Sequence, residues 1–202
     1  MSNGVDIRYL LNAYRADSGR VTFHGVRASL IRKQSAALGM TLLQKRVGDH
    51  DYEEVFYEAL LELRANGVKG MIFGDIDVQR NREWCERIAL RAGLEAVFPL
   101  WNIDQRKILE EFIGAGFRAV IVAVDSKFLP KEVLGKSIDL DWLKLMDRLR
   151  SEAICDPITY CGENGEYHSF VSGGPCFKSN MKFKTGESVQ RNGHWLIDLL
   201  EQ

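Results

Sequence analysis

Short apolar runs alternate with amphipathic helical patterns through the first 124 residues, and this alternation limits the folds open to the chain. The runs are rich in β-branched and aromatic residues and fall at residues 5–14, 41–47, 69–73, 94–98 and 117–124. The helical patterns between them end at Gly39, Gly67, Arg91 and Gly114. Strands that alternate with helices through short turns are typical of a parallel sheet wound by right-handed crossovers, so we expect an α/β fold.

Two aspartates are expected at the starts of helices. Asp51 is followed three residues later by Glu54, which resembles a capping box, and Asp104 precedes apolar residues at helical spacing. Each carboxylate would accept a hydrogen bond from a backbone N–H of the first helical turn, because those donors have no partner inside the helix.

The pattern changes after Asp125. Residues 129–138 are typical of a loop, residues 141–149 of a helix, and the residues from Tyr167 onward of β-strands, with a hairpin turn at Asn192-Gly193. We therefore divide the chain into an α/β domain over residues 1–101 and a smaller α+β domain with β-hairpins over residues 102–202.

The balance of charge argues against several classes of function. Lys and Arg total 27 against 28 for Asp and Glu, so no overall basic field attracts nucleic acid directly. The longest apolar run, residues 119–124, is too short to span a bilayer, and the N-terminus lacks the order of a signal peptide. We expect a cytoplasmic protein without a membrane partner, and the sequence leaves its oligomeric state open.

The four cysteines show no C-x-x-C spacing, so reduced thiols are expected rather than a disulfide framework. A zinc site is conceivable from Cys155, Cys161, His168 and Cys176, but their spacing matches no common zinc pattern. We treat zinc as a minor alternative.

Residues that follow the strands are the first candidates for a site, because ligands of a doubly wound sheet bind outside the carboxyl ends of the strands. Gly74 and Asp75 follow the third run, with Asp77 two positions on, and either carboxylate could bind Mg²⁺ through oxygen. Asp77 could instead cap the next helix. Trp101 follows the fourth run and could stack on a base or pack in the core.

A second candidate segment precedes the first helix. His24 and Gly25 lie where the backbone N–H groups of a helix N-terminus favour an anion. His24 could equally be a structural residue, and Arg27 could be solvated.

Residues 162–168 read Gly-Glu-Asn-Gly-Glu-Tyr-His and place two carboxylates, an amide, a phenol and an imidazole around two glycines. Glycine permits positive φ and close approach to a ligand, so such a loop can direct several side chains to one point. Asn164-Gly165 alone could be a hairpin turn. A turn does not account for Glu163, Glu166 and His168, which are therefore candidate site residues.

Five short motifs occur in the order found in one protein family. They are FHGVR at 23–27, GDI at 74–76, FPLW at 98–101, GF with the following apolar run at 116–124, and GENGEYH at 162–168. In these motifs, from about Val5 to about Phe183, the chain resembles the diphthine-ammonia ligase family, which is also described as N-type ATP pyrophosphatases.

This resemblance implies a HUP-type nucleotide-binding domain that uses ATP and Mg²⁺. It also implies an ATP-dependent amide ligase, in which a substrate carboxylate attacks the α-phosphorus of ATP, pyrophosphate leaves and ammonia captures the acyl-adenylate. A carboxylate is a poor acylating agent until adenylation gives it a good leaving group, while Mg²⁺ and cationic donors stabilise charge on the phosphates. The carboxylate could belong to a protein such as a translation elongation factor.

The resemblance assigns expected roles to the candidate residues. Glu163, Glu166 and His168 are expected to be catalytic, and substrate would contact Asn164, Gly165 and Tyr167. The residues expected to contact nucleotide are His24, Gly25, Arg27, Gly74, Asp75 and Trp101, and those expected to bind Mg²⁺ are Asp75 and Asp77.

The glycine-rich phosphate loop of this family, of the SGGKDS type, is not found in this sequence. The nearest string, residues 172–175, is expected to be a turn, whereas Ser2-Asn3-Gly4 has the residues of a helix C-terminus, as though one βα unit were absent before it. Three explanations stay open: a reading frame started too late, a non-catalytic paralogue that binds nucleotide or a partner, and a unit supplied by another chain.

Overall fold

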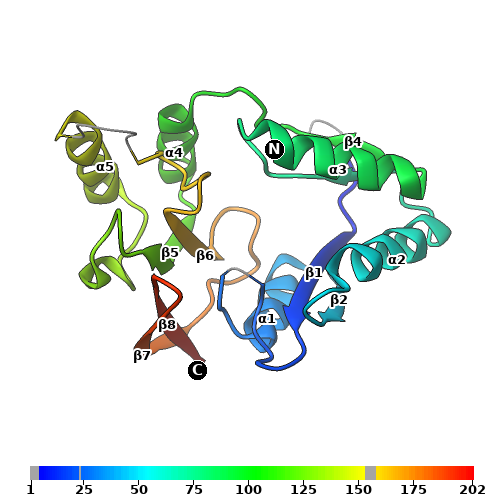
Figure 1. Ribbon diagram of the computed structural model, residues 1–202, viewed down its shortest axis with the longest axis horizontal. Helices are drawn as coiled ribbons and strands as arrows, with labels where there is room; N and C mark the ends of the chain where they lie inside the picture. The colour runs from blue at the N-terminus through cyan, green and yellow to red at the C-terminus, as the bar shows by residue number, and fades with distance from the viewer. Residues whose placement is uncertain (1–4, 23, 153–157) are drawn as a thin grey trace.

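The structure is a computed structural model that describes residues 5–22, 24–152 and 158–202 (Figure 1). The expectations for Ser2-Asn3-Gly4, Phe23, Cys155 and Asp156-Pro157 lie outside these residues. The first half contains β1 (Tyr9–Arg15), α1 (Ala28–Leu38), β2 (Thr41–Val47), α2 (Tyr52–Ala65), β3 (Gly70–Ile72), α3 (Gln79–Ala92) and β4 (Glu95–Val97). The second half contains α4 (Gln105–Gly114), β5 (Arg118–Asp125), the 3₁₀ turn η1 (Lys131–Val133), α5 (Leu140–Glu152), β6 (Tyr167–Gly173), β7 (Phe183–Arg191) and β8 (His194–Glu201).

The elements follow the predicted order, and the chain has a mixed α/β fold. The Asp104 carboxylate caps α4 as predicted, because it accepts a hydrogen bond from the backbone N–H of Lys107 at 2.8 Å. The predicted capping box at Asp51 is wrong. Asp51 precedes α2, but its carboxylate accepts from the N–H of Gly48 at 2.6 Å instead of from the helix.

The parallel strands that the sequence predicts in the first half of the chain are present, and they form two separate pairs. β1 pairs with β2 and β3 pairs with β4, and no ladder joins β1 to β3 within the described residues. Both pairs nevertheless share one core with α2 and α3, in which Leu11 of β1 and Met71 of β3 pack against the same buried cluster. The sheet is therefore interrupted between β1 and β3 while the helical layer continues.

β5 belongs to an antiparallel sheet with the order β6-β5-β8-β7, so the prediction that its apolar run is a strand of the parallel sheet is wrong. The run is buried on both faces for a different reason. Ala119 and Ile121 pack against α4 and α5, and Val120 and Val122 pack against the face that α1 covers. A strand covered on both faces has the same apolar pattern whether its neighbours are parallel or antiparallel.

α1 connects the two halves of the molecule. Its Leu30 and Ile31 lie in one buried cluster with Phe170 of β6 and Leu199 of β8. Figure 1 shows α1 between the β1–β2 pair and the antiparallel sheet, with α4 and α5 on the far side of that sheet. The loop that precedes β6 is thereby held near the ends of the parallel strands.

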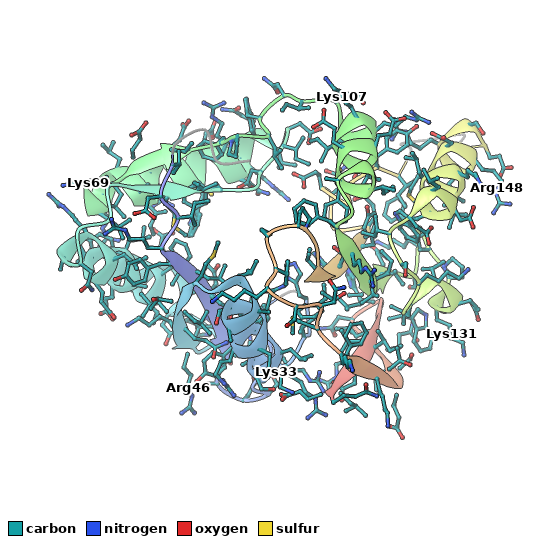
Figure 2. All side chains as sticks on the ribbon, turned by 180° about the vertical axis from the view of Figure 1, so that it is seen from behind. Lys33, Arg46, Lys69, Lys107, Lys131 and Arg148 are labelled. Carbon is teal, nitrogen blue, oxygen red and sulfur yellow. The ribbon has the colours of Figure 1, made fainter. Side chains whose placement is uncertain are left out.

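Cationic side chains lie on both halves of the molecule. The six cations labelled in Figure 2 lie apart around its periphery: Lys33, Arg46, Lys69, Lys107, Lys131 and Arg148. Among the helices of the described residues, none is both long and apolar enough to cross a membrane.

Candidate active site

The loop that precedes β6 is built on two glycines with left-handed backbone. Gly162 has φ 74° and Gly165 has φ 85°, and the N–H of Gly165 donates to the carbonyl of Gly162 at 2.9 Å. A Cβ on Gly162 would lie 2.6 Å from the backbone oxygen of Tyr167, so glycine is required there for space as well as for φ. The turn is centred on Glu163 and Asn164 and leads into β6; within the described residues it does not join two paired strands, so the interpretation of Asn164-Gly165 as a hairpin turn is wrong.

Glu166 holds this loop together from inside. Its side chain is 1% exposed, and its two oxygens accept from the N–H of Thr159 at 2.7 Å, the hydroxyl of Thr159 at 3.0 Å and the N–H of Asn164 at 2.9 Å. The same threonine oxygen accepts from the N–H of Glu163 at 2.9 Å. A carboxylate with three internal donors organises the loop and leaves little capacity for substrate.

Glu163 reaches across to the loop that follows β3. Its Oε2 accepts from the backbone N–H of Ile76 at 3.2 Å. Burial raises the pKa of Glu163 to about 7, with Asp77, Asp75 and Glu166 adding to the rise and the Ile76 N–H opposing it. A carboxyl group with a pKa near neutrality can accept and release a proton at physiological pH, which suits general acid–base catalysis.

Asp75 and Asp77 both lie in the loop that Glu163 contacts. One oxygen of Asp75 accepts from the thiol of Cys85 at 3.6 Å, and burial together with Asp75 raises the pKa of that thiol to about 12. Asp77 is exposed and its Oδ2 accepts from the side-chain amide of Gln105 at 2.7 Å. It does not cap α3, whose preceding residue is Val78.

His24 and His168 come together although 144 positions separate them in the sequence. Their ring centroids lie 4.7 Å apart with an interplanar angle of 42°. Burial lowers the pKa of both rings, and for His168 the neighbouring His24 and His194 help to lower it to about 4. Both imidazoles are therefore neutral at physiological pH and can accept as well as donate a hydrogen bond.

Gly25 and Arg27 lie beside this pair but are committed to packing and to an ion pair. Gly25 has φ 67°, and a Cβ there would lie 2.5 Å from the Leu196 side chain. Arg27 donates to both oxygens of Asp198 on β8 at 3.0 and 2.5 Å, and Arg20 donates to one of them at 2.9 Å. Arg27 thus joins the segment before α1 to the antiparallel sheet.

Trp101 lies half-buried beneath a cation. The guanidinium of Arg82 lies 4.6 Å from the Trp101 ring centroid and 5.1 Å from that of Phe98, so it covers part of the aromatic surface. Gly74 is exposed, and a Cβ there would meet no atom within 4 Å.

Of the residues expected to contact substrate, two lie at or near the surface and one lies in the core. Asn164 is exposed, and Gly165 is partly exposed at the turn. Tyr167 is 3% exposed, packs edge-on against Trp142 at 5.0 Å and donates its hydroxyl proton to the carbonyl of Tyr160 at 2.5 Å. The structure thus brings Glu163 to the loop that carries Asp75 and Asp77 and pairs His24 with His168, but it places Tyr167 in the core.

Sequence reasoning missed the residues that hold these groups in place. Gln105, Thr159 and Asp198 each bind a candidate residue, yet each has a residue type common on protein surfaces and no motif marks it. Within the described residues, no three His, Cys, Asp or Glu side chains come together as a metal site would require.

Two sequence models of one family cover nearly the whole chain. The model of the diphthamide synthase N-terminal domain matches residues 1–96, and that of the diphthamide synthase C-terminal domain matches residues 104–200. The chain belongs to this family.

Curated relatives agree with this family, and several are named diphthine–ammonia ligase. The chain is 32% identical to the human protein over 143 residues, which is 69% of this chain and 51% of the relative. It is 30% identical to the zebrafish (Danio rerio) protein over 143 residues, covering 70% and 54%, and 31% identical to the Schizosaccharomyces pombe protein over 114 residues, covering 56% and 18%. The alignments thus span about half the length of the vertebrate relatives and less of the yeast one.

Proposed function

We propose that this chain acts in an ATP-dependent amide ligase, which adenylates a substrate carboxylate and transfers ammonia to it. The observation that carries this proposal is the hydrogen bond from Ile76 to Glu163, because it brings a proton-accepting carboxyl group to the strand end that holds Asp75 and Asp77. Family membership and the names of the relatives support the same chemistry.

The reaction is a substitution at phosphorus followed by one at carbon. A carboxylate oxygen of the substrate attacks the α-phosphorus of ATP, and pyrophosphate leaves with the electron pair of the broken P–O bond. Ammonia then attacks the acyl carbon, AMP leaves with the C–O electron pair, and the nitrogen loses a proton. Glu163, whose pKa is about 7, is placed in this proposal to accept that proton.

Mg²⁺ fits the donor set of this site only in part. The carboxylates of Asp75 and Asp77 are oxygen donors in the same loop, and Mg²⁺ commonly binds through one or two carboxylates completed by phosphate oxygens and water. When bound, Mg²⁺ would neutralise charge on the phosphates. The protein residues would hold the ion through these two carboxylates and leave its other positions to the nucleotide.

The other candidate residues take supporting roles in this proposal. Glu166 would hold the loop, since its oxygens are occupied by internal donors, while the neutral pair His24–His168 would hydrogen-bond to nucleotide or substrate. Gly74 would allow the nucleotide to approach the backbone, while Gly25 would leave room for the Leu196 side chain and Arg27 would position the segment before α1. Trp101 with Arg82 would form one wall, and Asn164 and Gly165 would contact the substrate.

A HUP-type nucleotide-binding domain would place a phosphate loop at the carboxyl end of a central strand. We propose that the interruption between β1 and β3 is the place for such a strand, because both strand pairs pack on the same helical layer and are not paired to each other in the described residues. Val5 and Ile7, just before β1, and Ile72 of β3 are exposed apolar residues that a further strand would cover. We propose that the chain has two domains, at residues 1–101 and 102–202.

The substrate of this chain is proposed by analogy with its relatives. Their name refers to diphthine and ammonia, so a diphthine carboxylate on a protein such as a translation elongation factor is the first substrate to test. The alternative is a protein that binds nucleotide or a partner without catalysis, which the interrupted sheet favours.

Exchange of labelled pyrophosphate into ATP tests this function. The chain, supplied with Mg²⁺ and the diphthine-bearing protein, is expected to catalyse exchange that depends on the carboxylate substrate. Glu163→Gln is expected to slow amide formation by about 100-fold while leaving exchange measurable, because it removes a proton acceptor but no contact to the phosphates. Glu187→Gln, at an exposed position of β7, is the matched control. ATP binding without exchange would favour the non-catalytic alternative.

A further inference from the structure

Gln105 joins the two loops of the candidate site. Its Nε2 donates to Oδ2 of Asp77 at 2.7 Å, and its Oε1 accepts from the backbone N–H of Cys161 at 2.9 Å. The thiol of Cys161 also donates to the backbone oxygen of Gln105 at 3.4 Å. One residue thus connects the loop after β3, the start of α4 and the loop before β6.

These contacts require the chemistry of a side-chain amide. Only a group with both a donor and an acceptor can bind a carboxylate on one side and a backbone N–H on the other. Glutamate at position 105 would face the Asp77 carboxylate with a second negative charge, and leucine would leave both partners without their bond. Asparagine would be shorter by one methylene and could not keep both contacts.

Gln105 is itself held by a fixed element. It is the first residue of α4, directly after the capping residue Asp104, whose carboxylate accepts from Lys107. The next residue, Arg106, donates to both oxygens of Asp147 on α5 at 2.9 and 3.0 Å. The amide therefore extends from a rigid helix start to two loops.

We propose that Gln105 is a positioning residue that fixes the loop of Glu163 against the loop of Asp77, so that the bond between Glu163 and the Ile76 N–H can form. The Ile76–Glu163 bond joins the same two loops close to Gln105, and Gln105 acts on it indirectly through Asp77 and Cys161. The catalytic importance of this role rests on the proposed function, whereas the geometry can be tested without activity.

Amide hydrogen exchange measured by NMR tests the positioning role. Gln105→Leu is expected to lower protection about tenfold at the Cys161 N–H, which loses its acceptor, and also at the Ile76 N–H, which Gln105 does not bind. A local hydrogen bond without a positioning role would change Cys161 alone. Unchanged protection at Ile76 would overturn the proposal, and so would an equal loss of protection at Leu60 in α2, since that would indicate general destabilisation.

A double variant that exchanges the hydrogen-bond donor and acceptor between positions 77 and 105 tests whether protection at Ile76 can be restored. Gln105→Glu alone is expected to lower protection at Ile76, because two carboxylates then face each other. Adding Asp77→Asn restores one donor between positions 77 and 105, and protection at Ile76 is expected to return to within about threefold of the wild-type value. Failure of the double variant to recover would count against the proposal. This comparison also stands if Gln105→Leu does not fold.

Gln79→Leu is the matched control, because Gln79 is the first residue of α3 and donates to the exposed Glu83 at 2.9 Å. It is expected to leave protection at Ile76 unchanged.

Binding of Mg-ATP, measured by calorimetry, separates the role of Gln105 from the proposed function. About tenfold weaker binding in Gln105→Leu, with normal binding in Gln79→Leu, supports both the role and the function. A wild-type chain that binds no Mg-ATP overturns the proposed function, while the exchange data still decide the role of Gln105.

Discussion

The Glu163 carboxylate accepts a hydrogen bond at 3.2 Å from the backbone N–H of Ile76, 87 positions earlier in the chain. This bond connects the loop before β6 to the strand end that carries Asp75 and Asp77. It also places Glu163 among other carboxylates in a partly buried site, which together with burial raises its pKa to about 7.

The raised pKa of Glu163 predicts how stability depends on pH. An unfolded glutamate titrates near 4.5, so between this pH and about 7 the folded protein binds more protons than the unfolded chain. The contribution of Glu163 to the free energy of unfolding is therefore present below pH 4.5 and lost as the pH rises towards 7 and above.

Glu163→Gln should remove this loss, because glutamine is neutral at every pH and its oxygen can still accept from Ile76. Urea denaturation at pH 5 and pH 8 is expected to show the variant gaining roughly 1 kcal/mol over the wild type at the higher pH, after allowance for solvent screening. Parallel pH profiles for the two proteins would contradict the raised pKa.

The pair His24–His168 predicts that its contribution to stability rises with pH, opposite to that of Glu163. Burial and the neighbouring histidines lower the pKa of His168 from 6.5 to about 4, so between these values the unfolded chain binds the proton and the folded protein does not. The stability contribution of the neutral ring is complete above pH 6.5 and is lost as the pH falls towards 4.

His168→Gln should therefore reduce the loss of stability on acidification from pH 7 to pH 4.5, as measured by the midpoint of urea denaturation. His50→Gln is the control, since His50 is exposed in the loop before α2 and should leave the profile unchanged. The same slope in His168→Gln and in the wild type would show that the imidazole is not kept neutral by the fold.

The sequence predicted the order of elements well because each is defined by local periodicity. β2 has the predicted bounds, and α3 begins at the predicted residue Gln79. Partners of the strands are set by distant residues, so the antiparallel neighbours of β5 could not be read from the pattern.

The candidate site was predicted unevenly for a similar reason. Glu163 and Asp75 were found because motifs and strand ends point to them. The distinction between Glu163, which faces the other loop, and Glu166, which is bound inside its own loop, depends on Ile76 and Thr159. Gln105 was missed because a glutamine after a helix cap is usually solvated.

The hydrogen bonds that Glu166 accepts predict that its replacement destabilises the protein, whereas replacement of Glu163 does not. Glu166→Gln replaces one accepting oxygen by an NH₂ group that faces N–H donors of Thr159 or Asn164. It is expected to destabilise the protein by about 2 kcal/mol in urea denaturation and to lower exchange protection at both amides. Stability equal to the wild type at neutral pH would contradict the role of Glu166 as the anchor of the loop.

The two loop glycines differ in the space around them. Gly162→Ala would bring Cβ within 2.6 Å of the Tyr167 backbone oxygen and also force alanine to φ 74°, whereas Gly165→Ala meets only the cost of φ 85°. We expect about 1 kcal/mol of destabilisation for Gly165→Ala and at least twice as much for Gly162→Ala, measured by urea denaturation. Equal losses would mean that the backbone of Tyr167 moves to admit the methyl group.

The ion pair of Arg27 and Arg20 with Asp198 should couple the two halves of the molecule. Its carboxylate is only 19% exposed, and the guanidinium of Arg27, followed by that of Arg20, holds the pKa of Asp198 at about 2. Asp198→Ala leaves two cations without their partner and is expected to lower the free energy of unfolding by about 1–2 kcal/mol after solvent screening. Asp141→Ala is the control, because it breaks an exposed ion pair with Lys144 and should change stability little. Hydrogen exchange should also increase in α1 and β8 together for Asp198→Ala, and an increase confined to β8 would show that the ion pair does not join them.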